Sequence, residues 1–199
     1  FFKGAVMMLS IEQLDLKNKR VLIRADLNVP LENGSVADDF RIRSSLPTIQ
    51  ECLKKGAKVI VMSHLGRPKG KDPAFSLKPI AKRLEELLGA PVRFVGETLG
   101  EMVKREVESL KPGKDVLVLE NVRFEAGEEK NDSELAKAYA ELCDVYVNDA
   151  FASSHRAHAS IVGVADRVQE KAAGLLLLRE VTSLKAVVDN PKRPLSVVL

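Results

Sequence analysis

The sequence predicts an α/β protein with a Rossmann-like open parallel sheet of about six strands, flanked by helices on both faces in a three-layer αβα arrangement. Two observations lead to this prediction. Short runs rich in Val, Ile and Leu recur along the 199 residues, and an amphipathic stretch with apolar residues three or four apart follows most of them. The strand candidates are apolar at nearly every position, which is typical of parallel sheets covered on both faces.

Each element has local signals of its own. The stretch 41–56 has the 3.6-residue apolar period of a helix and ends on Gly56, and the next helix candidate ends on Gly89. The expected strands are residues 21–27, 58–63, 92–95, 115–120, 144–149 and 195–199. The expected helices are residues 41–56, 77–89, 100–113, 133–143 and about 170–188, and residues 151–166 are expected to form a long loop or a loop with a short helix.

The composition is that of a protein with a sizeable core and a balanced surface. Hydrophobic residues make up 45% of the chain and charged residues 30%, and the formal net charge is only +3. Proteins that bind nucleic acid often have a larger or more clustered basic excess. Aromatic residues are 5% with no Trp, which leaves few platforms for stacked bases. We therefore expect no nucleic-acid partner.

Several features favour a reducing, cytoplasmic setting. Two cysteines, Cys52 and Cys143, are too few for a disulfide framework, and both fall in helix-like stretches, so we expect them to be reduced. No apolar run approaches the roughly 20 residues of a membrane span. The N-terminal stretch FFKGAVMMLSIEQ is too short and too weakly patterned for a signal peptide. Residues 1–6 are expected to lie outside the fold.

Polar and cationic residues follow the predicted strands where each strand ends. Right-handed crossovers place these ends on one edge of the sheet, which is where open α/β sheets bind ligands. Arginine forks bind carboxylate and phosphate, so several of them on one edge indicate a small polyanion. The residues expected there are Asp26, Asn28, Arg41, His64, Arg67, Arg123, His155, Arg156 and His158.

The stretch SHLGRPKG, residues 63–70, carries the clearest example. Gly66 and Pro68 are expected to shape the turn, whereas His64 and Arg67 are expected to meet an anion. The stretch does not fit a nucleotide-binding phosphate loop, because residues 66–71 are one residue short of that motif and no Ser or Thr follows the lysine. The glycine fingerprint of dinucleotide-binding proteins is also absent from the sequence.

Three other signals have two interpretations each. His155 and His158 have metal-like spacing, but no Cys or carboxylate cluster accompanies them, so we expect no metal site. Asp26 is either a general base or a group that orients a substrate hydroxyl or fixes Arg24 and Arg41, and the orienting role is favoured. The acidic stretch 125–132 is expected to be a solvated surface loop.

Six motifs occur in a fixed order along the chain. They are RVLIRADLNVP (20–30), the helix start at Arg41, MSHLGRP (62–68), LENVRF (119–124), YVNDAF (146–151) and SHRAHAS (154–160). In order and rough spacing they resemble phosphoglycerate kinase over about residues 9–199. Two small departures are Leu27, where the family usually has Phe, and Ser154, where it often has Ala.

The resemblance implies a two-lobed glycolytic enzyme of about twice this length. Such an enzyme transfers a phosphoryl group reversibly between 1,3-bisphosphoglycerate and ADP, with 3-phosphoglycerate on its N-terminal lobe and Mg²⁺ with ATP or ADP on its C-terminal lobe. The resemblance also assigns roles to individual residues. It implies that Arg41 stabilises the transferring group, that Asp26 and Asn28 bind the hydroxyl and carboxyl end, and that His64, Arg67, Arg123 and Arg156 bind the 3-phosphate end.

The resemblance further divides the chain. Residues 1–188 are expected to be the substrate-binding domain with an interdomain helix near 170–188, and residues 189–199 the hinge and first strand of a C-terminal nucleotide-binding domain. We expect a monomer, no nucleotide or metal site in this chain, and no turnover from it alone. Two alternatives are a non-catalytic anion-binding module and another doubly wound enzyme such as a dehydrogenase, against which the missing glycine fingerprint counts.

Overall fold

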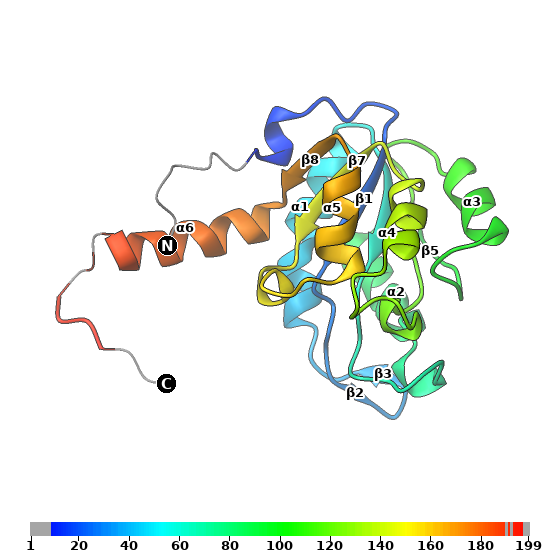
Figure 1. Cartoon of the computed structure of the whole chain (residues 1–199), viewed down its shortest axis with the longest axis horizontal. Helices are drawn as coiled ribbons and strands as arrows, with labels where there is room; N and C mark the ends of the chain where they lie inside the picture. The colour runs from blue at the N-terminus through cyan, green and yellow to red at the C-terminus, as the bar shows by residue number, and fades with distance from the viewer. Residues whose placement is uncertain (1–8, 190, 192, 197–199) are drawn as a thin grey trace.

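The computed structural model describes residues 9–189, 191 and 193–196, and a six-stranded parallel sheet forms its centre (Figure 1). The strand order is β5-β6-β4-β1-β7-β8, so β1 lies inside the sheet between β4 and β7. This confirms the predicted open parallel sheet. The strands are β1 (Arg20–Ala25), β4 (Lys58–Met62), β5 (Val92–Phe94), β6 (Val116–Val118), β7 (Val145–Asp149) and β8 (Glu170–Ala173).

Helices cover both faces of the sheet, as predicted for three layers. Along β1, Val21 and Ile23 belong to one buried core, and Leu22 belongs to the other. The first core is closed by α1 and α2, and the second by α3, α4 and α5. The helices are α1 (Phe40–Lys54), α2 (Lys78–Leu88), α3 (Glu101–Glu108), α4 (Ser133–Ala140), α5 (Val164–Arg167) and α6 (Leu175–Asp189).

The prediction of a helix from residue 170 was wrong for its first four residues. Residues 170–173 form β8, which pairs in parallel with β7, and α6 begins only at Leu175. Gly174 lies between β8 and α6. A side chain does not fit at this position, because a Cβ would lie 2.1 Å from the carboxylate oxygen Oδ1 of Asp149. The strand sequence EKAA has no β-branched residue, so its local pattern favours a helix and only pairing with β7 makes it a strand.

The strands of the structure differ from the predicted strands in two places. The sixth strand of the sheet is β8, whereas the strand expected at 195–199 falls largely on residues 197–199, outside the described part. A small antiparallel hairpin, β2 (Leu31–Glu32) and β3 (Ser35–Val36), was not predicted. Its turn is Asn33-Gly34, and both residues have positive φ, which is typical of two-residue hairpin turns.

The segment after β7 contains the predicted loop with short helices. It contains 3₁₀ residues Phe151–Ser153, a π-helix over Ala159–Gly163, and then α5. Figure 1 shows α6 extending away from the sheet, and beyond Leu178 nearly all of its residues are half-buried or exposed. No helix in the described part of the chain is long and apolar enough to cross a membrane.

Candidate anion-binding site

Hydrogen bonds join the loops that follow β1, β4 and β6 at one edge of the sheet. The Asn28 side-chain oxygen accepts the Gly66 N–H at 2.8 Å, and the Leu27 N–H donates to Ser63 Oγ at 2.9 Å. The Arg123 guanidinium donates to the Gly66 carbonyl. The predicted convergence of strand ends is therefore present, and the side chains of this edge are held by neighbouring loops.

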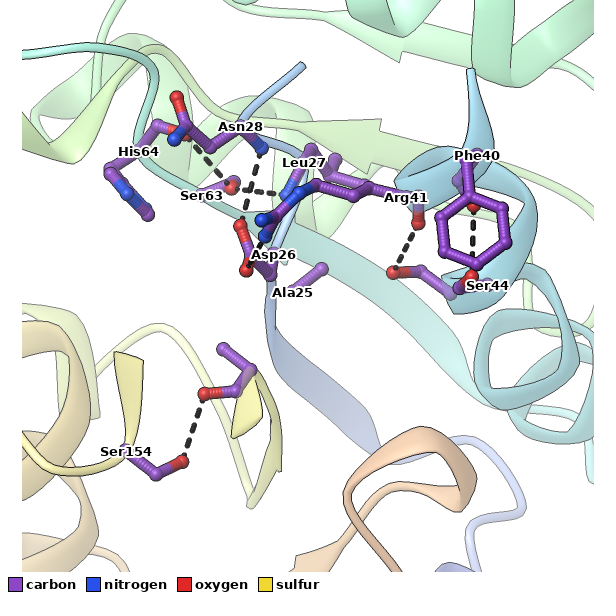
Figure 2. A network of polar contacts seen from close by, with 12 residues as sticks. Ala25, Asp26, Leu27, Asn28, Phe40, Arg41, Ser44, Ser63, His64 and Ser154 are labelled. Atoms are coloured by element: carbon purple, nitrogen blue, oxygen red, sulfur yellow. Dashed lines mark hydrogen bonds and ion pairs between the residues drawn. The ribbon is translucent and has the colours of Figure 1, made fainter. Parts of the chain in front are cut away.

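Arg41 and Asp26 form an ion pair at this edge, which Figure 2 shows from close by. Arg41 lies in the first turn of α1 with its side chain 46% exposed, whereas Asp26 is buried. Asp26 therefore orients Arg41, as one of the alternatives predicted. The expectation that Asp26 also fixes Arg24 is wrong, because Arg24 forms its hydrogen bonds with Ser160, with His64 and with the carbonyl of Ala25.

The SHLGRPKG turn depends on glycine at its centre. Gly66 has a φ of +59°, and a Cβ there would lie 2.3 Å from the ring of Phe75. The preceding Leu65 is clamped by Asn121, whose amide group accepts from its N–H and donates to its carbonyl. The turn is thus fixed by its own packing, and Arg67 projects from it as an exposed side chain.

Arg123 lies among other cations. Burial lowers its pKa, Glu129 partly offsets this, and the charges of Arg156, Arg24 and Arg67 lower it further. Its Nε atom is buried and has no hydrogen-bond partner among the described residues. Positive charges that lie close together repel one another unless a negative charge is present. The arrangement therefore favours an anion beside Arg123.

His64 is buried at the same edge and is neutral. Burial is the main cause that lowers its pKa to about 2, and the charges of Arg24, Arg123 and Arg156 add to it. His64 therefore contributes hydrogen-bonding capacity to the site without adding a further charge.

Arg24 was missed as a site residue. It lies within β1, is 1% exposed, and contacts His64 and Ser160. The sequence did contain a signal, because a charged side chain inside the apolar run VLIRADL must find buried partners.

The loop after β7 brings the remaining predicted residues. Arg156 is half-buried and its Nε lies 3.4 Å from His155 Nε2, and His155 is exposed. His158 is buried, and burial lowers its pKa. Across residues 9–189 and the few described beyond them, no group of three or more His, Cys, Asp or Glu side chains has the arrangement of a metal site.

The prediction of a solvated acidic loop at 125–132 was wrong for one residue. Glu128 is fully buried, whereas its neighbour Glu129 is exposed. The Glu128 carboxylate accepts the N–H of Ser160 at 3.0 Å and its hydroxyl at 2.5 Å. Ser160 in turn contacts the buried guanidinium of Arg24, so Glu128 is linked to this buried cation through Ser160. Burial raises the pKa of Glu128, and the hydrogen bond from Ser160 and the charge of Arg24 act in the opposite direction.

A cleft of about 520 Å³ lies away from this edge, between the β2-β3 hairpin and α2. Its arginine, Arg83, is already paired with Asp39 at 2.7 Å and with Glu86 at 2.6 Å. This cleft therefore lacks the excess positive charge of the strand-end edge, and we take the edge as the site.

Comparisons with known proteins show the family to which the chain belongs. The sequence model of the family "Phosphoglycerate kinase" matches residues 11–199. The phosphoglycerate kinases of Thermosipho africanus and Dictyoglomus turgidum are 53% and 52% identical to the chain over 192 residues, which is 96% of this chain and 47% and 48% of theirs.

Solved structures give the same result. Phosphoglycerate kinase from Coxiella burnetii matches with a TM-score of 0.82 and 44% identity, and that from Pyrococcus horikoshii with 0.86 and 34%. Both matches cover 94% of this chain, but 46% and 47% of theirs. The chain thus spans about half the length of the relatives it matches, and it belongs to the phosphoglycerate kinase family.

Proposed function

We propose that this chain is the N-terminal, acid-binding half of a phosphoglycerate kinase. The whole enzyme would transfer a phosphoryl group between 1,3-bisphosphoglycerate and ADP. The observation that carries the proposal is the cluster of Arg24, Arg67 and Arg156 around Arg123, where burial and these charges lower the pKa of Arg123. Family membership supports it and leaves no basis for the dehydrogenase alternative.

The geometry supports a division of labour among the site residues. Arg67, Arg123 and Arg156 supply donors and positive charge for the non-reacting 3-phosphate, and His64 adds a neutral contact. Asn28 uses its side-chain oxygen on Gly66, which leaves its amide nitrogen to donate to the carboxyl or hydroxyl end of the acid. We assign Asp26 to the same end.

Arg41 is the residue to which we assign the chemical step. Phosphoryl transfer depends mainly on positioning and on neutralising the charge of the transferring group. The Arg41 guanidinium is held at one side by Asp26 and is exposed, so it can contact a group that arrives from outside this domain. The other arginines would hold the acid in place while transfer occurs.

We assign nucleotide binding to a C-terminal domain of the same polypeptide. Mg²⁺ would arrive with ATP or ADP, since the cation-rich edge described above repels a free divalent cation. Residues 1–188 would form the acid-binding domain, with α6 as the interdomain helix and the residues from 189 onward as the hinge. Closure of the hinge would exclude water from the reacting groups. We further propose a monomeric, cytoplasmic enzyme.

Calorimetry of this chain with 3-phosphoglycerate at low salt tests the proposal. We expect weak binding that fades as salt is added, because exposed charges are screened. Arg20→Ala is the matched control, since Arg20 lies at the opposite edge and is paired with Asp144. No binding of millimolar 3-phosphoglycerate would contradict the proposal.

A coupled assay with Mg-ATP and 3-phosphoglycerate tests the assignment of the nucleotide to another domain. We expect this chain alone to show only background turnover. The whole polypeptide should be active, and inactivity there would favour the alternative of a non-catalytic anion-binding module.

A further inference from the structure

A continuous chain of buried polar contacts lies behind the anion-binding edge. Its members come from β1, the loop after β4, the acidic stretch and the π-helix. Arg24 Nε lies 2.9 Å from Ser160 Oγ, and Arg24 Nη2 lies 3.2 Å from His64 Nδ1. Ser160 Oγ lies 2.5 Å from Glu128 Oε1. The exposed fractions are 0% for Glu128 and Ser160, 1% for Arg24 and 7% for His64.

The chemistry of arginine fixes the direction of the two hydrogen bonds that Arg24 makes with Ser160 and His64. A guanidinium has only donors, so Ser160 Oγ must accept from Arg24 Nε. The single hydroxyl proton of Ser160 is then free to point to Glu128, which accepts it. On the other side, His64 Nδ1 must also accept from Arg24, so this nitrogen carries no proton.

The remaining ring nitrogen of His64 faces a different environment. Nε2 has no hydrogen-bond partner among the described residues, and it is not one of their fully enclosed unpartnered atoms. It therefore retains contact with solvent. A neutral imidazole whose Nδ1 is bare has its proton on Nε2.

We propose that Glu128 and Ser160 are positioning residues which, through Arg24, hold His64 as a neutral ring with its proton on Nε2. His64 then donates a hydrogen bond to the bound anion and cannot accept one from it. The identity of that anion as 3-phosphoglycerate rests on the proposed function, but the arrangement of the four side chains does not.

Ser160 is held rigidly enough to serve this role. Its carbonyl accepts the Tyr146 hydroxyl at 2.9 Å, and its N–H donates to the second carboxylate oxygen of Glu128 at 3.0 Å. It belongs to the π-helix Ala159–Gly163, a rare conformation that is frequent at functional sites. His158 Nδ1 lies 3.7 Å from Glu128 Oε1, too far for a hydrogen bond.

Nitrogen-15 NMR of the histidine rings in this chain tests the proposal without any ligand. The chain has three histidines, so the spectrum of His64→Gln identifies the His64 signals by their loss. We expect a neutral ring protonated on Nε2 at every pH from about 5 to 8, the range in which ordinary histidines titrate. A ring protonated on Nδ1, or one that titrates in this range, would overturn the proposal.

Two variants test whether Glu128 and Ser160 are responsible. Ser160→Ala removes the acceptor of Arg24 Nε, and Glu128→Gln replaces the carboxylate by an amide of the same shape. Each should shift the His64 ring signals and weaken 3-phosphoglycerate binding about tenfold, the scale of one hydrogen bond to a charged group. Ser45→Ala is the matched control, because Ser45 is a buried serine whose hydroxyl, among the described residues, donates one hydrogen bond, to the Arg41 carbonyl.

The outcomes separate this inference from the proposed function. If a variant remains folded by its amide spectrum while its His64 signals and affinity match those of the Ser45→Ala control, the positioning role is wrong. If the wild-type chain does not bind 3-phosphoglycerate, the proposed function fails, and the ring signals still decide the inference. If both variants unfold, the wild-type ring spectrum remains the deciding measurement.

Discussion

Arginines lie at both ends of the parallel strands, but in opposite electrostatic settings. At the N-terminal edge, Arg20 pairs with Asp144 at 2.7 Å, and this hydrogen bond raises the pKa of its guanidinium. The neighbouring Lys19 pairs with Glu170 at 2.7 Å. At the C-terminal edge, burial and nearby cations lower the pKa of Arg123. Both edges have counter-charges, since Asp26 pairs with Arg41 and Glu129 lies 3.1 Å from Arg123, but at the C-terminal edge the arginines outnumber them.

This difference in electrostatic surroundings separates an arginine that stabilises the fold from an arginine that binds a ligand. A protein gains little from exposed pairs such as Arg20–Asp144, which are worth about 0–1 kcal/mol, but it also loses nothing by keeping them. Buried cations without enough counter-charge cost stability, so they are retained where a ligand completes them. Substitutions at the two edges should therefore have different effects.

The largest effect is expected at Arg41, in an enzyme that carries this sequence as its N-terminal half. Arg41→Ala should lower kcat about a thousandfold, because a charge matched to the transferring phosphoryl group is removed. Steady-state kinetics would measure this. Arg43→Ala is the matched control on the same helix, since Arg43 is exposed and paired with Asp39. A near-normal kcat in Arg41→Ala would show that the role belongs to another residue.

Arg67→Ala should have the next largest effect, and mainly on KM. Arg67 is assigned to the phosphate that does not react, so it binds ground state and transition state equally. The loss of a charge-assisted contact should raise KM for 3-phosphoglycerate about ten- to a hundredfold in the same assay. If Arg67→Ala instead abolishes kcat while Arg41→Ala does not, the two assignments are reversed.

A smaller effect is expected on stability at acid pH. The unfolded chain takes up a proton at His64 near pH 6.5, whereas the folded chain does so only near pH 2. Acid therefore favours the unfolded state, and the stability present above pH 6.5 is lost as the pH falls. At pH 5 the loss from His64 should be about 2 kcal/mol.

Urea unfolding of this chain between pH 5 and 7 measures this loss. His64→Gln should flatten the decline in stability relative to the wild type, whatever its effect at pH 7. His155→Gln is the control, because His155 is exposed. An unchanged decline in His64→Gln would show that the folded chain protonates His64 as readily as the unfolded one.

The smallest effect is expected at the paired edge. Arg20→Ala should lower the free energy of unfolding by about 1 kcal/mol or less, because the two side chains of its ion pair with Asp144 are 36% and 43% exposed. Its affinity for 3-phosphoglycerate, measured by calorimetry, should equal that of the wild type. A loss of affinity comparable with that of Arg67→Ala would remove the distinction between the two edges.

The sequence by itself determined the layers of the fold and the edge on which the site lies. Apolar periodicity is a local property, so it located α1 and the strands β1, β4 and β7 to within two residues at either end. Strand-helix alternation then placed every strand end on one edge, since crossovers are right-handed. Arg41 and Arg67 were assigned to this edge in the same way, because each assignment depends only on the residue's place in the chain.

Only the tertiary structure decided which polar groups are buried and which partners they have. Glu128 and Glu129 are adjacent residues of the same type, but only Glu128 is buried. Its carboxylate accepts a hydrogen bond from Ser160, which lies 32 positions further along the chain. Residues 170–173 became a strand through pairing with β7. Burial and partner choice depend on contacts between distant segments, and a buried charge is stable only where such a contact satisfies it, so no local pattern encodes them.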